Sequence, residues 1–541
     1  MSTSAMRHDV PVLSSRALNI LCLMIIVFGI LLRFFEITHN NFIFYDEGMY
    51  LNHNRELLAK IKEFPPKDLN ELLAIFKIIF YSALATAKWL WFFISNLRIF
   101  VGGPDAFYFN RVVSAVCGVL TVGLTYMFTQ KVFKSKDIAL LSAAVLAVLP
   151  SHVFYSRLAM QESFSTLCLL VGAYLYISGC DFRLRSILAA IFFSAVFFTN
   201  YRMVVLPVLL VVLEIFYSMS HKRSWDWVKW LGTTLAFYGI IFWIGSLNHG
   251  SNRFITTAWM THQAQMAAQE WRWLDLFSYP YDIFVLEGFL FGLLFFSNVY
   301  WLYKRDWQKF LPGAIVLAQM AMFSFAAERG ARYLCVVLPF AVMAGALSIR
   351  YFVLNAGLFK RWAALLLLGM VFCSLAAKSV AVAQTPSGYE QAVKILQQKD
   401  PQAKILATQP LLVNLWVSDP SVVESAPKDF RDLIIRYSQG YRYLILDPQA
   451  YVSWTATGEH FTTPLADYLG FIRAKMSPVV KFSHLNLTLM ERFVLDHNEN
   501  FLNSANFLNR RDEDFGAVYV YDLTQCIAVM QKVAESLSKN K

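Results

Sequence analysis

Charged residues are scarce in this chain of 541 residues, because Asp, Glu, Lys and Arg together make up only 16% of it. With 57% hydrophobic residues, 47 of the residues being Phe, the composition excludes an ordinary soluble globular protein. Of the seven cysteines only Cys526 lies outside the apolar segments, which excludes a disulfide framework. We therefore predict an integral membrane protein, in which the net charge of +11 reflects helix orientation rather than nucleic-acid binding.

Several chemical signatures are also missing. The sequence contains no Gly-rich phosphate loop, no zinc-ligand spacing, no nucleophile elbow, no internal repeat and no low-complexity segment. The chemistry must therefore be sought in the polar residues between the apolar runs.

Long apolar runs, by contrast, are plentiful. A helix needs about 20 apolar residues to cross the hydrocarbon core of a bilayer. Runs of about this length occur near residues 16–34, 112–130, 138–156, 163–179, 186–201, 203–219, 229–247, 288–303, 310–327, 333–354 and 362–383. This pattern predicts about eleven spans, the first being an uncleaved anchor.

The short connections between these runs indicate the orientation. Every second one, such as "QKVFKSKD" and "YKRDWQK", is rich in Lys and Arg, which is typical of the cytoplasmic side. The N-terminus is then cytoplasmic too. Counting residues 72–97, which include Lys77 and Lys88, as a span would reverse this bias, so we predict juxtamembrane helices on the outer face there.

The composition changes near Thr385, where polar residues return. The segments "AKILATQ", "YRYLILDP" and "AVYVYDL" are typical of strands, and "DFRDLIIRYSQG" of an amphipathic helix that ends at Gly440. We therefore predict a membrane domain over 1–384, with a first outer loop at 41–111, and a soluble α/β domain over 385–541 outside the cytoplasm.

The outer loops hold the candidate site. The first contains Asp46 and Glu47 in "FIFYDEGMYLNHNREL", together with His53, and the later ones contain arginine at 157, 202, 329 and 332 but no lysine. The planar fork of arginine binds phosphate oxygens in two places at once. Carboxylates and arginines together suit a phosphorylated substrate whose reaction partner must lose a proton.

Other roles for these residues are open at this point. Arginines at helix ends also cap carbonyls or contact lipid headgroups, and Glu162 also suits the first turn of a helix. A transporter or flippase of a lipid-linked saccharide would need arginines and a cavity as well. A transporter also needs polar groups in mid-membrane, where the spans are nearly free of charge apart from Glu214. A non-catalytic scaffold with a working outer domain is the third alternative.

Asp46 and Glu47, placed directly after the first span, resemble the acidic motif of membrane glycosyltransferases with the GT-C fold. The similarity continues through "FNRVVSAVCGVL", "LPSHVFYSRLAMQES", "FFTNYRMVVLP" and "AERGARYLCVVLPF", and covers residues 15–350. Within that fold, the chain is similar to the protein O-mannosyltransferases and the bacterial lipid A aminoarabinose transferase. The His-Pro-Pro motif of many relatives is missing near Lys88, and the tail does not resemble their sugar-binding repeats.

The resemblance implies an inverting transfer of a sugar from a polyprenyl-phosphate carrier to a lipid, glycan or protein acceptor on the outer face. It implies that Asp46 is the general base, that Glu47 supports it and that Glu162 orients a substrate. It also implies that the arginines at positions 157, 202, 329 and 332 bind the donor phosphate. Further substrate contacts are expected from Tyr45, His53, Lys88, Tyr201 and Tyr333.

The prediction is therefore an α-helical polytopic GT-C membrane protein with a C-terminal α/β domain. Its expected place is the plasma membrane of a bacterium, with the C-terminal domain in the periplasm. No cofactor is expected beyond the lipid-linked donor, and because no Asp-x-Asp motif occurs in the first outer loop, the reaction is expected to be metal-independent.

Overall fold

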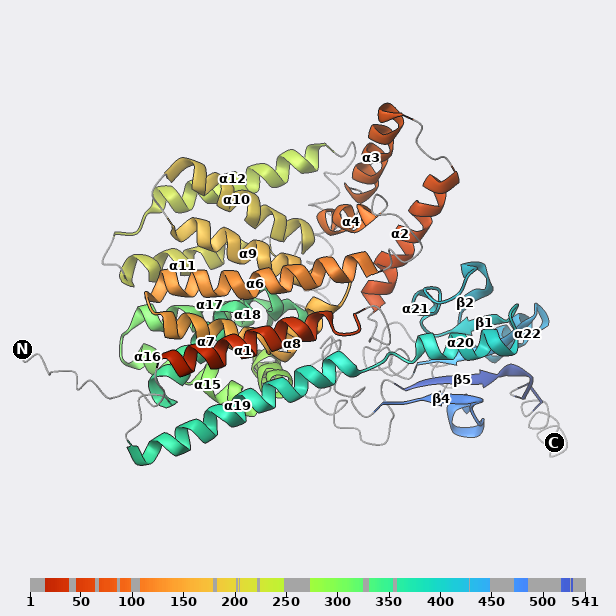
Figure 1. Ribbon diagram of the computed structural model, residues 1–541. Helices are drawn as coiled ribbons and strands as arrows, with labels where there is room; N and C mark the ends of the chain where they lie inside the picture. The colour runs from red at the N-terminus through yellow and green to blue at the C-terminus, as the bar shows by residue number, and fades with distance from the viewer. Residues whose placement is uncertain are drawn as a thin grey trace, which may run out of the picture. The chain divides into compact units, whose positions relative to one another are not determined.

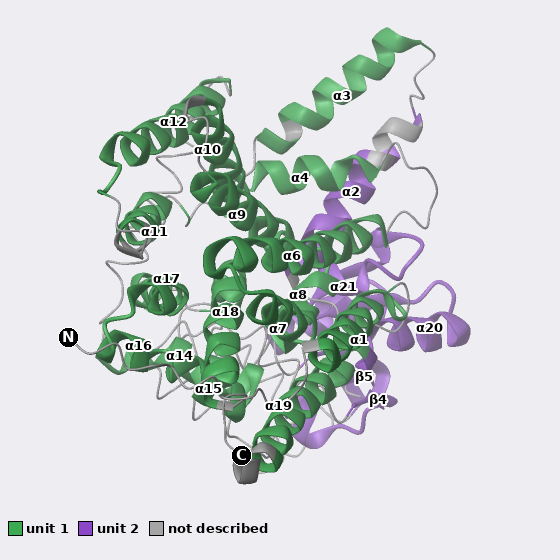
Figure 2. Cartoon of the chain, turned by 60° about the vertical axis from the view of Figure 1, so that its left-hand side comes forward, with its two compact units in different colours: residues 1–37, 65–383 green, residues 38–64, 384–541 purple. Residues whose placement is uncertain are grey.

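A computed structural model describes most of the two halves of this chain. The described residues are 15–37, 45–63, 68–84, 88–98, 108–178, 182–200, 203, 205–220, 224–247, 273–324, 330–353, 358–427, 429–447, 471–484, 517–525 and 527–528. The chain divides into two compact units, of residues 1–37 with 65–383 and of residues 38–64 with 384–541 (Figure 2).

The elements described for the first unit are all helices, and each predicted apolar run coincides with helices. In chain order these are α1 (Ser15–Phe34), α3 (Leu69–Leu84), α4 (Trp89–Asn96), α6 (Phe109–Phe133), α7 (Lys136–Ala147), α8 (Pro150–Arg157), α9 (Glu162–Ile177), α10 (Phe182–Thr199), α11 (Leu206–Ser220), α12 (Trp227–Ser246), η3 (Trp273–Phe277), α14 (Ser278–Asp282), η4 (Ile283–Glu287), α15 (Phe289–Phe296), α16 (Val299–Tyr303), α17 (Trp307–Ser324), η5 (Ala331–Val337), α18 (Leu338–Ser348), η6 (Ile349–Val353) and α19 (Leu358–Gln384).

These helices are those of a membrane protein. Among the described residues, five helices are long and apolar enough to cross a membrane, or six if α7 and α8 form one bent span, and four shorter apolar helices accompany them. Large apolar side chains such as Leu23, Leu31, Leu235 and Phe242 face outward, which suits contact with lipid rather than water. The number of eleven spans stays a prediction.

The helices pack as neighbours in a layered bundle (Figure 1). Helix α7 contacts α1, α6 and α18, while α9 lies between α6 and α10, and α10 contacts α12. Small residues allow the close approaches: a Cβ at Gly29 of α1 would lie only 2.2 Å from the Ala147 carbonyl oxygen.

One expected span, residues 138–156, is broken. Helices α7 and α8 meet at 56°, because Pro150 has no N–H to donate to the Leu146 carbonyl oxygen. The polar groups at the break find partners elsewhere. The Arg33 guanidinium donates to the carbonyl oxygens of Leu146 (3.2 Å) and Ala147 (2.6 Å). The Ser379 hydroxyl donates to Val148 O (2.8 Å), and the backbone N–H of Ser151 donates to the Glu287 carboxylate (3.3 Å).

The ambiguous segment at residues 72–97 forms two helices rather than one. Helix α3 has 16 residues and α4 has eight, and both are shorter than a membrane span requires. Their aromatic side chains meet edge to face, with the Phe80 and Trp89 ring centroids 5.9 Å apart. The helices are therefore as predicted, while their juxtamembrane position stays a prediction.

The second unit contains a five-stranded mixed sheet in the order β2-β1-β3-β5-β4. Its strands are β1 (Lys404–Ala407), β2 (Val423–Ser425), β3 (Tyr441–Leu446), β4 (Val480–Phe482) and β5 (Val518–Asp522). Strand β1 pairs in parallel with β2 and β3, whereas β5 pairs antiparallel with β3 and β4. The three predicted strands thus form the centre of the sheet.

Helices cover both faces of this sheet. Helix α20 (Tyr389–Lys399) and the short α21 (Pro410–Val413) share one apolar core with Ile405, Ile445 and Val520. On the opposite face, Leu433 of α22 (Phe430–Ser438) packs with Leu444. Helix α22 ends at Ser438, two residues before Gly440, whose φ of +98° suits glycine at the end of the helix, as predicted. The described part of the second unit also contains the one-turn η7 (Pro420–Val422) and α2 (Tyr45–Glu63).

Candidate functional site

Asp46 and Glu47 lie in the first turn of helix α2, which belongs to the second unit (Figure 2). Negative side chains suit this place because the N-terminal end of a helix carries a partial positive charge. The preceding residues 41–44 and the side chain of Tyr45 lie outside the described residues.

The two neighbouring acids have different surroundings. Consecutive residues of an α-helix point about 100° apart, so one helix face holds Asp46 and another holds Glu47. The Glu47 side chain is fully buried, on the same side as Leu51 and Asn54, whereas the Asp46 side chain is half-buried. Asp46 is therefore the more exposed of the two acids, and half-buried His53 lies two turns further along the same face.

In the first unit, Arg157 ends helix α8 and is buried. Its guanidinium donates to the carbonyl oxygen of Leu32, in the last turn of α1, and to that of Ala383 (3.1 Å), in the last turn of α19. Arg157 thus caps two helix ends, which is one of the roles considered from the sequence. Phosphate binding by Arg157 stays a prediction.

Glu162 is the first residue of helix α9 and is buried. One of its carboxylate oxygens accepts from the Gln161 side-chain amide at 3.1 Å. One turn later, the Thr166 hydroxyl contacts the Cys335 carbonyl oxygen at 3.2 Å, which holds η5 against the start of α9. Two predicted site residues, Arg332 and Tyr333, lie in η5, so this contact brings them to the same end of the bundle as Glu162.

Arg332 and Tyr333 form a small cluster with α17. The Arg332 guanidinium lies over the Tyr333 ring at 5.1 Å, and Phe323 stacks on the same ring with the centroids 5.6 Å apart. The Gln319 amide donates to the Tyr333 carbonyl oxygen at 3.4 Å. Arg332 is half-buried, so its guanidinium combines a fixed position with partial exposure, as an anion ligand requires.

Lys88 is the residue before helix α4 and reaches the same end of the bundle through α10. The ring of Trp89 lies 5.0 Å from that of Phe198, and the neighbouring Thr199 hydroxyl contacts the Ser165 hydroxyl in the first turn of α9. The end of α10, the start of α9 and the start of α4 therefore meet. Tyr201, Arg202 and Arg329 lie outside the described residues.

Sequence reasoning missed several buried polar residues beside α8. Arg33 donates to the His152 Nδ1 at 2.6 Å, and Arg111 donates to the Ile37 carbonyl oxygen at 3.4 Å. Glu287 accepts from the backbone of Ser151 (3.3 Å), one turn and a half before Arg157. The signal was available, because an ionisable residue inside or beside an apolar run is by default a candidate for a structural or functional site.

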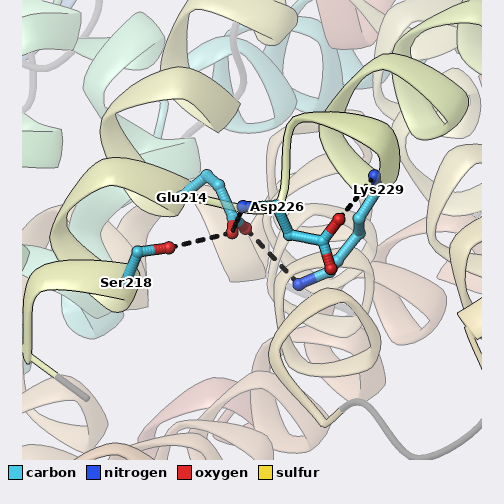
Figure 3. A network of polar contacts seen from close by, with 4 residues as sticks. All are labelled: Glu214, Ser218, Asp226 and Lys229. Atoms are coloured by element: carbon cyan, nitrogen blue, oxygen red, sulfur yellow. Dashed lines mark hydrogen bonds and ion pairs between the residues drawn. The ribbon is translucent and has the colours of Figure 1, made fainter. Parts of the chain in front are cut away.

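A second polar network lies at the other end of the helices (Figure 3). Glu214 of α11 pairs with Lys229 of α12 at 3.4 Å and accepts from Ser218 (3.1 Å) and the Asp226 backbone (3.2 Å). The Lys229 ammonium also lies 3.8 Å from the Tyr176 ring centroid. Glu214 is therefore a buried, paired residue between three helices.

Comparisons with known proteins extend this picture. Residues 23–256 match the family model described as dolichyl-phosphate-mannose-protein mannosyltransferase. That stretch contains Asp46 and Glu47 as well as Arg157 and Glu162. The comparison with curated protein sequences found no match.

Solved structures of similar fold exist. ArnT from Cupriavidus metallidurans, bound to undecaprenyl phosphate, superposes with a TM-score of 0.52 and 12% identity over 82% of this chain and 95% of that protein. The oligosaccharyltransferase of Archaeoglobus fulgidus, tethered with an acceptor peptide, gives 0.50 and 11% identity over 84% of this chain and 72% of that protein. These matches confirm the predicted resemblance: this chain is a membrane protein with the GT-C fold of glycosyltransferases, and its residues 23–256 match the protein mannosyltransferase family.

Proposed function

We propose that the protein transfers a sugar from a polyprenyl-phosphate carrier to an acceptor on the outer face of the membrane, with inversion at the anomeric carbon. The observation that carries the proposal is the family match over residues 23–256, which includes Asp46, Glu47 and Glu162. The solved relative bound to undecaprenyl phosphate supports a donor carried on a lipid phosphate.

Asp46 is the proposed general base. An attacking hydroxyl must lose its proton as the new glycosidic bond forms, and a partly exposed carboxylate at the start of α2 suits this task. The buried Glu47 is proposed to support it, and Glu162, fixed by Gln161, to orient a substrate.

The leaving group is a lipid phosphate, and negative charge grows on its oxygen as the sugar departs. Fixed positive charge stabilises that change. We propose Arg332 as the first phosphate ligand, because its guanidinium is half-buried and held over Tyr333. Arg202 and Arg329, and Arg157 beyond its two capping bonds, are proposed to assist, and His53, Lys88, Tyr45, Tyr201 and Tyr333 to contact substrates.

The test is transfer by the purified protein in nanodiscs, with a panel of radiolabelled polyprenyl-phosphate sugars and a cell-envelope extract as acceptor. We expect Asp46→Asn to lower transfer by about 10²–10⁴-fold while the donor still binds. Asp432→Asn is the matched control, because Asp432 lies in the first turn of α22 and is not proposed to act. Substantial turnover by Asp46→Asn would remove the base assignment, and no transfer from any donor by the unaltered protein would contradict the function.

The same assay tests the phosphate ligand and the metal. Arg332→Lys keeps the charge but loses the fork, so we expect a higher KM for the donor. If Arg332→Lys had the same donor affinity and transfer rate as the unaltered protein, Arg332 would have a structural role only. We propose a metal-independent reaction, for which transfer after dialysis against EDTA equals that before it, and restoration by added Mg²⁺ or Mn²⁺ would refute this point.

A further inference from the structure

Helix α2 contains a glycine near its start, and glycine in a helix costs about 1 kcal/mol relative to alanine. The structure gives a reason for Gly48. A Cβ at this position would lie 2.6 Å from the Leu412 side chain and 3.2 Å from the Leu411 carbonyl oxygen. Gly48 therefore allows the backbone of α2 to approach α21 directly.

Two further residues hold α2 at this place. The Asn52 amide donates to the Leu411 carbonyl oxygen at 2.7 Å and to that of Gly48 at 2.7 Å. The Arg55 guanidinium donates to three carbonyl oxygens, those of Asn414 (2.7 Å), Val417 (2.9 Å) and Ser418 (2.9 Å). One planar fork thus binds the chain on both sides of a turn, and the single ammonium of lysine cannot reproduce this geometry.

The partner of α2 is itself firmly placed. Leu412, Val413 and Val417 are buried in the apolar core that α20 forms with the sheet. Asp419 follows directly, and its pKa lies below the ordinary value because it accepts from Ser421 and lies near the Arg55 charge. Residues 410–418 therefore form a platform fixed to the sheet, and we call it the docking platform.

The face of α2 that contacts the docking platform determines the direction of its other faces. Gly48, Asn52 and Arg55 follow the i, i+4, i+7 spacing of one helix face. At about 100° per residue, Asp46 lies roughly 160° around the helix from Gly48, and His53 lies close to it. Docking therefore turns Asp46 away from the platform, which agrees with its half-buried side chain.

We propose that Asn52 and Arg55 are positioning residues, which hold α2 on the docking platform and thereby set the direction of Asp46. The second unit then acts as the holder of the proposed base, whatever its part in acceptor recognition. This inference rests on the proposed function, because it concerns the base of the proposed transfer.

The experiment compares Arg55→Ala and Arg55→Lys in the full-length protein. Hydrogen exchange of the α2 amides measures docking, and the transfer assay gives kcat and the donor KM separately. We expect faster exchange in α2 and a kcat lowered by about 100-fold in Arg55→Ala, since a small misplacement of a reacting group has effects of this size. The donor KM should stay within about twofold, because only kcat reports transition-state interactions that a displaced base removes.

Arg442→Ala is the matched control. Arg442 also donates to a backbone carbonyl of the second unit, that of Tyr437 at 2.7 Å, but it lies on β3, and its hydrogen bonds among the described residues go to Tyr437 and Tyr441. It should leave the exchange of α2 and kcat unchanged. Hydrogen exchange in β3 and β5 reports whether the sheet stays folded. If Arg55→Ala unfolds the sheet, Arg55→Lys becomes the test of the positioning role. In that variant we expect an intermediate loss of exchange protection in α2 and an intermediate loss of kcat.

Each result separates the two proposals. Unchanged exchange in α2 would overturn the docking role, and faster exchange with an unchanged kcat would overturn the positioning role. If the unaltered protein transfers no sugar from any donor, the proposed function fails and the positioning of a base fails with it. Transfer by the unaltered protein combined with normal kcat in both Arg55 variants would overturn this inference alone.

Discussion

At the scale of single residues, several buried polar side chains form hydrogen bonds with the backbone. Arg33, Arg157 and Glu287 each bind a backbone group at a helix end or at the break between α7 and α8. In a membrane such groups have no water to satisfy them, so an unpaired N–H or carbonyl is expensive. A charged residue in an apolar segment can therefore be structural even beside a site.

Glu287 gives a prediction of this kind. Its contact with the Ser151 N–H needs an acceptor but no charge, so Glu287→Gln should change the free energy of unfolding by less than about 1 kcal/mol. Glu287→Leu leaves the Ser151 N–H without this acceptor and should lower the free energy of unfolding by about 1–3 kcal/mol. Thermal unfolding in detergent measures both, and an equal loss in the two variants would show that the charge itself matters.

At the scale of elements, the position of each helix depends on a few polar contacts between neighbours. The Glu214–Lys229 pair joins α11 to α12 (Figure 3). The Lys229 ammonium also lies over the Tyr176 ring of α9. Both partners are buried, so removing one leaves the other without its countercharge in an apolar surrounding.

This network predicts a non-additive pair of mutations. Lys229→Met alone should destabilise the protein by about 3–5 kcal/mol, whereas adding Glu214→Gln should recover most of that loss. Unfolding curves of the two single variants and the double variant test the coupling. The transfer rate at low temperature should stay normal, because the network lies at the end of the helices opposite Glu162. Additive losses would contradict the pairing.

The sequence predicted the individual helices and strands better than it predicted their contacts. The strands β1, β3 and β5, the helix α22 and the apolar helices are predictable, because each is a local pattern with its own period. The break at Pro150 was missed, since the run at 138–156 is apolar on both sides of it and apolarity does not report direction. The role of Arg55 was invisible, because its partners lie 359 to 363 residues away in the sequence.

The site shows the same limit. The acids and arginines could be found as residue types in outer loops, and the structure brings Lys88, Glu162, Arg332 and Tyr333 to one end of the bundle. The different burial of Asp46 and Glu47 depends on how α2 is docked, which no local pattern contains.

At the scale of the whole molecule, the prediction concerns orientation in the membrane. Cysteine at Ser438, which is exposed in the second unit, should react with an impermeant maleimide in intact spheroplasts. Cysteine at Ser224, exposed before α12 in a predicted cytoplasmic loop, should react only after the membrane is opened. The parent protein needs serine in place of the exposed Cys373 and of Cys180 and Cys526. The reverse labelling would invert the predicted topology.

The second unit is assembled from two distant stretches, residues 38–64 and residues 384–541. During synthesis, Arg55 leaves the ribosome 359 residues ahead of its first partner carbonyl at Asn414. At about 5–20 residues per second, that interval lasts about 20–70 s. Helix α2 must wait undocked through this time while the membrane helices are made and inserted. If docking positions Asp46 as proposed, transfer begins only after residues 410–418 and the sheet that holds them have been translated. A chain terminated before these residues would not catalyse the transfer.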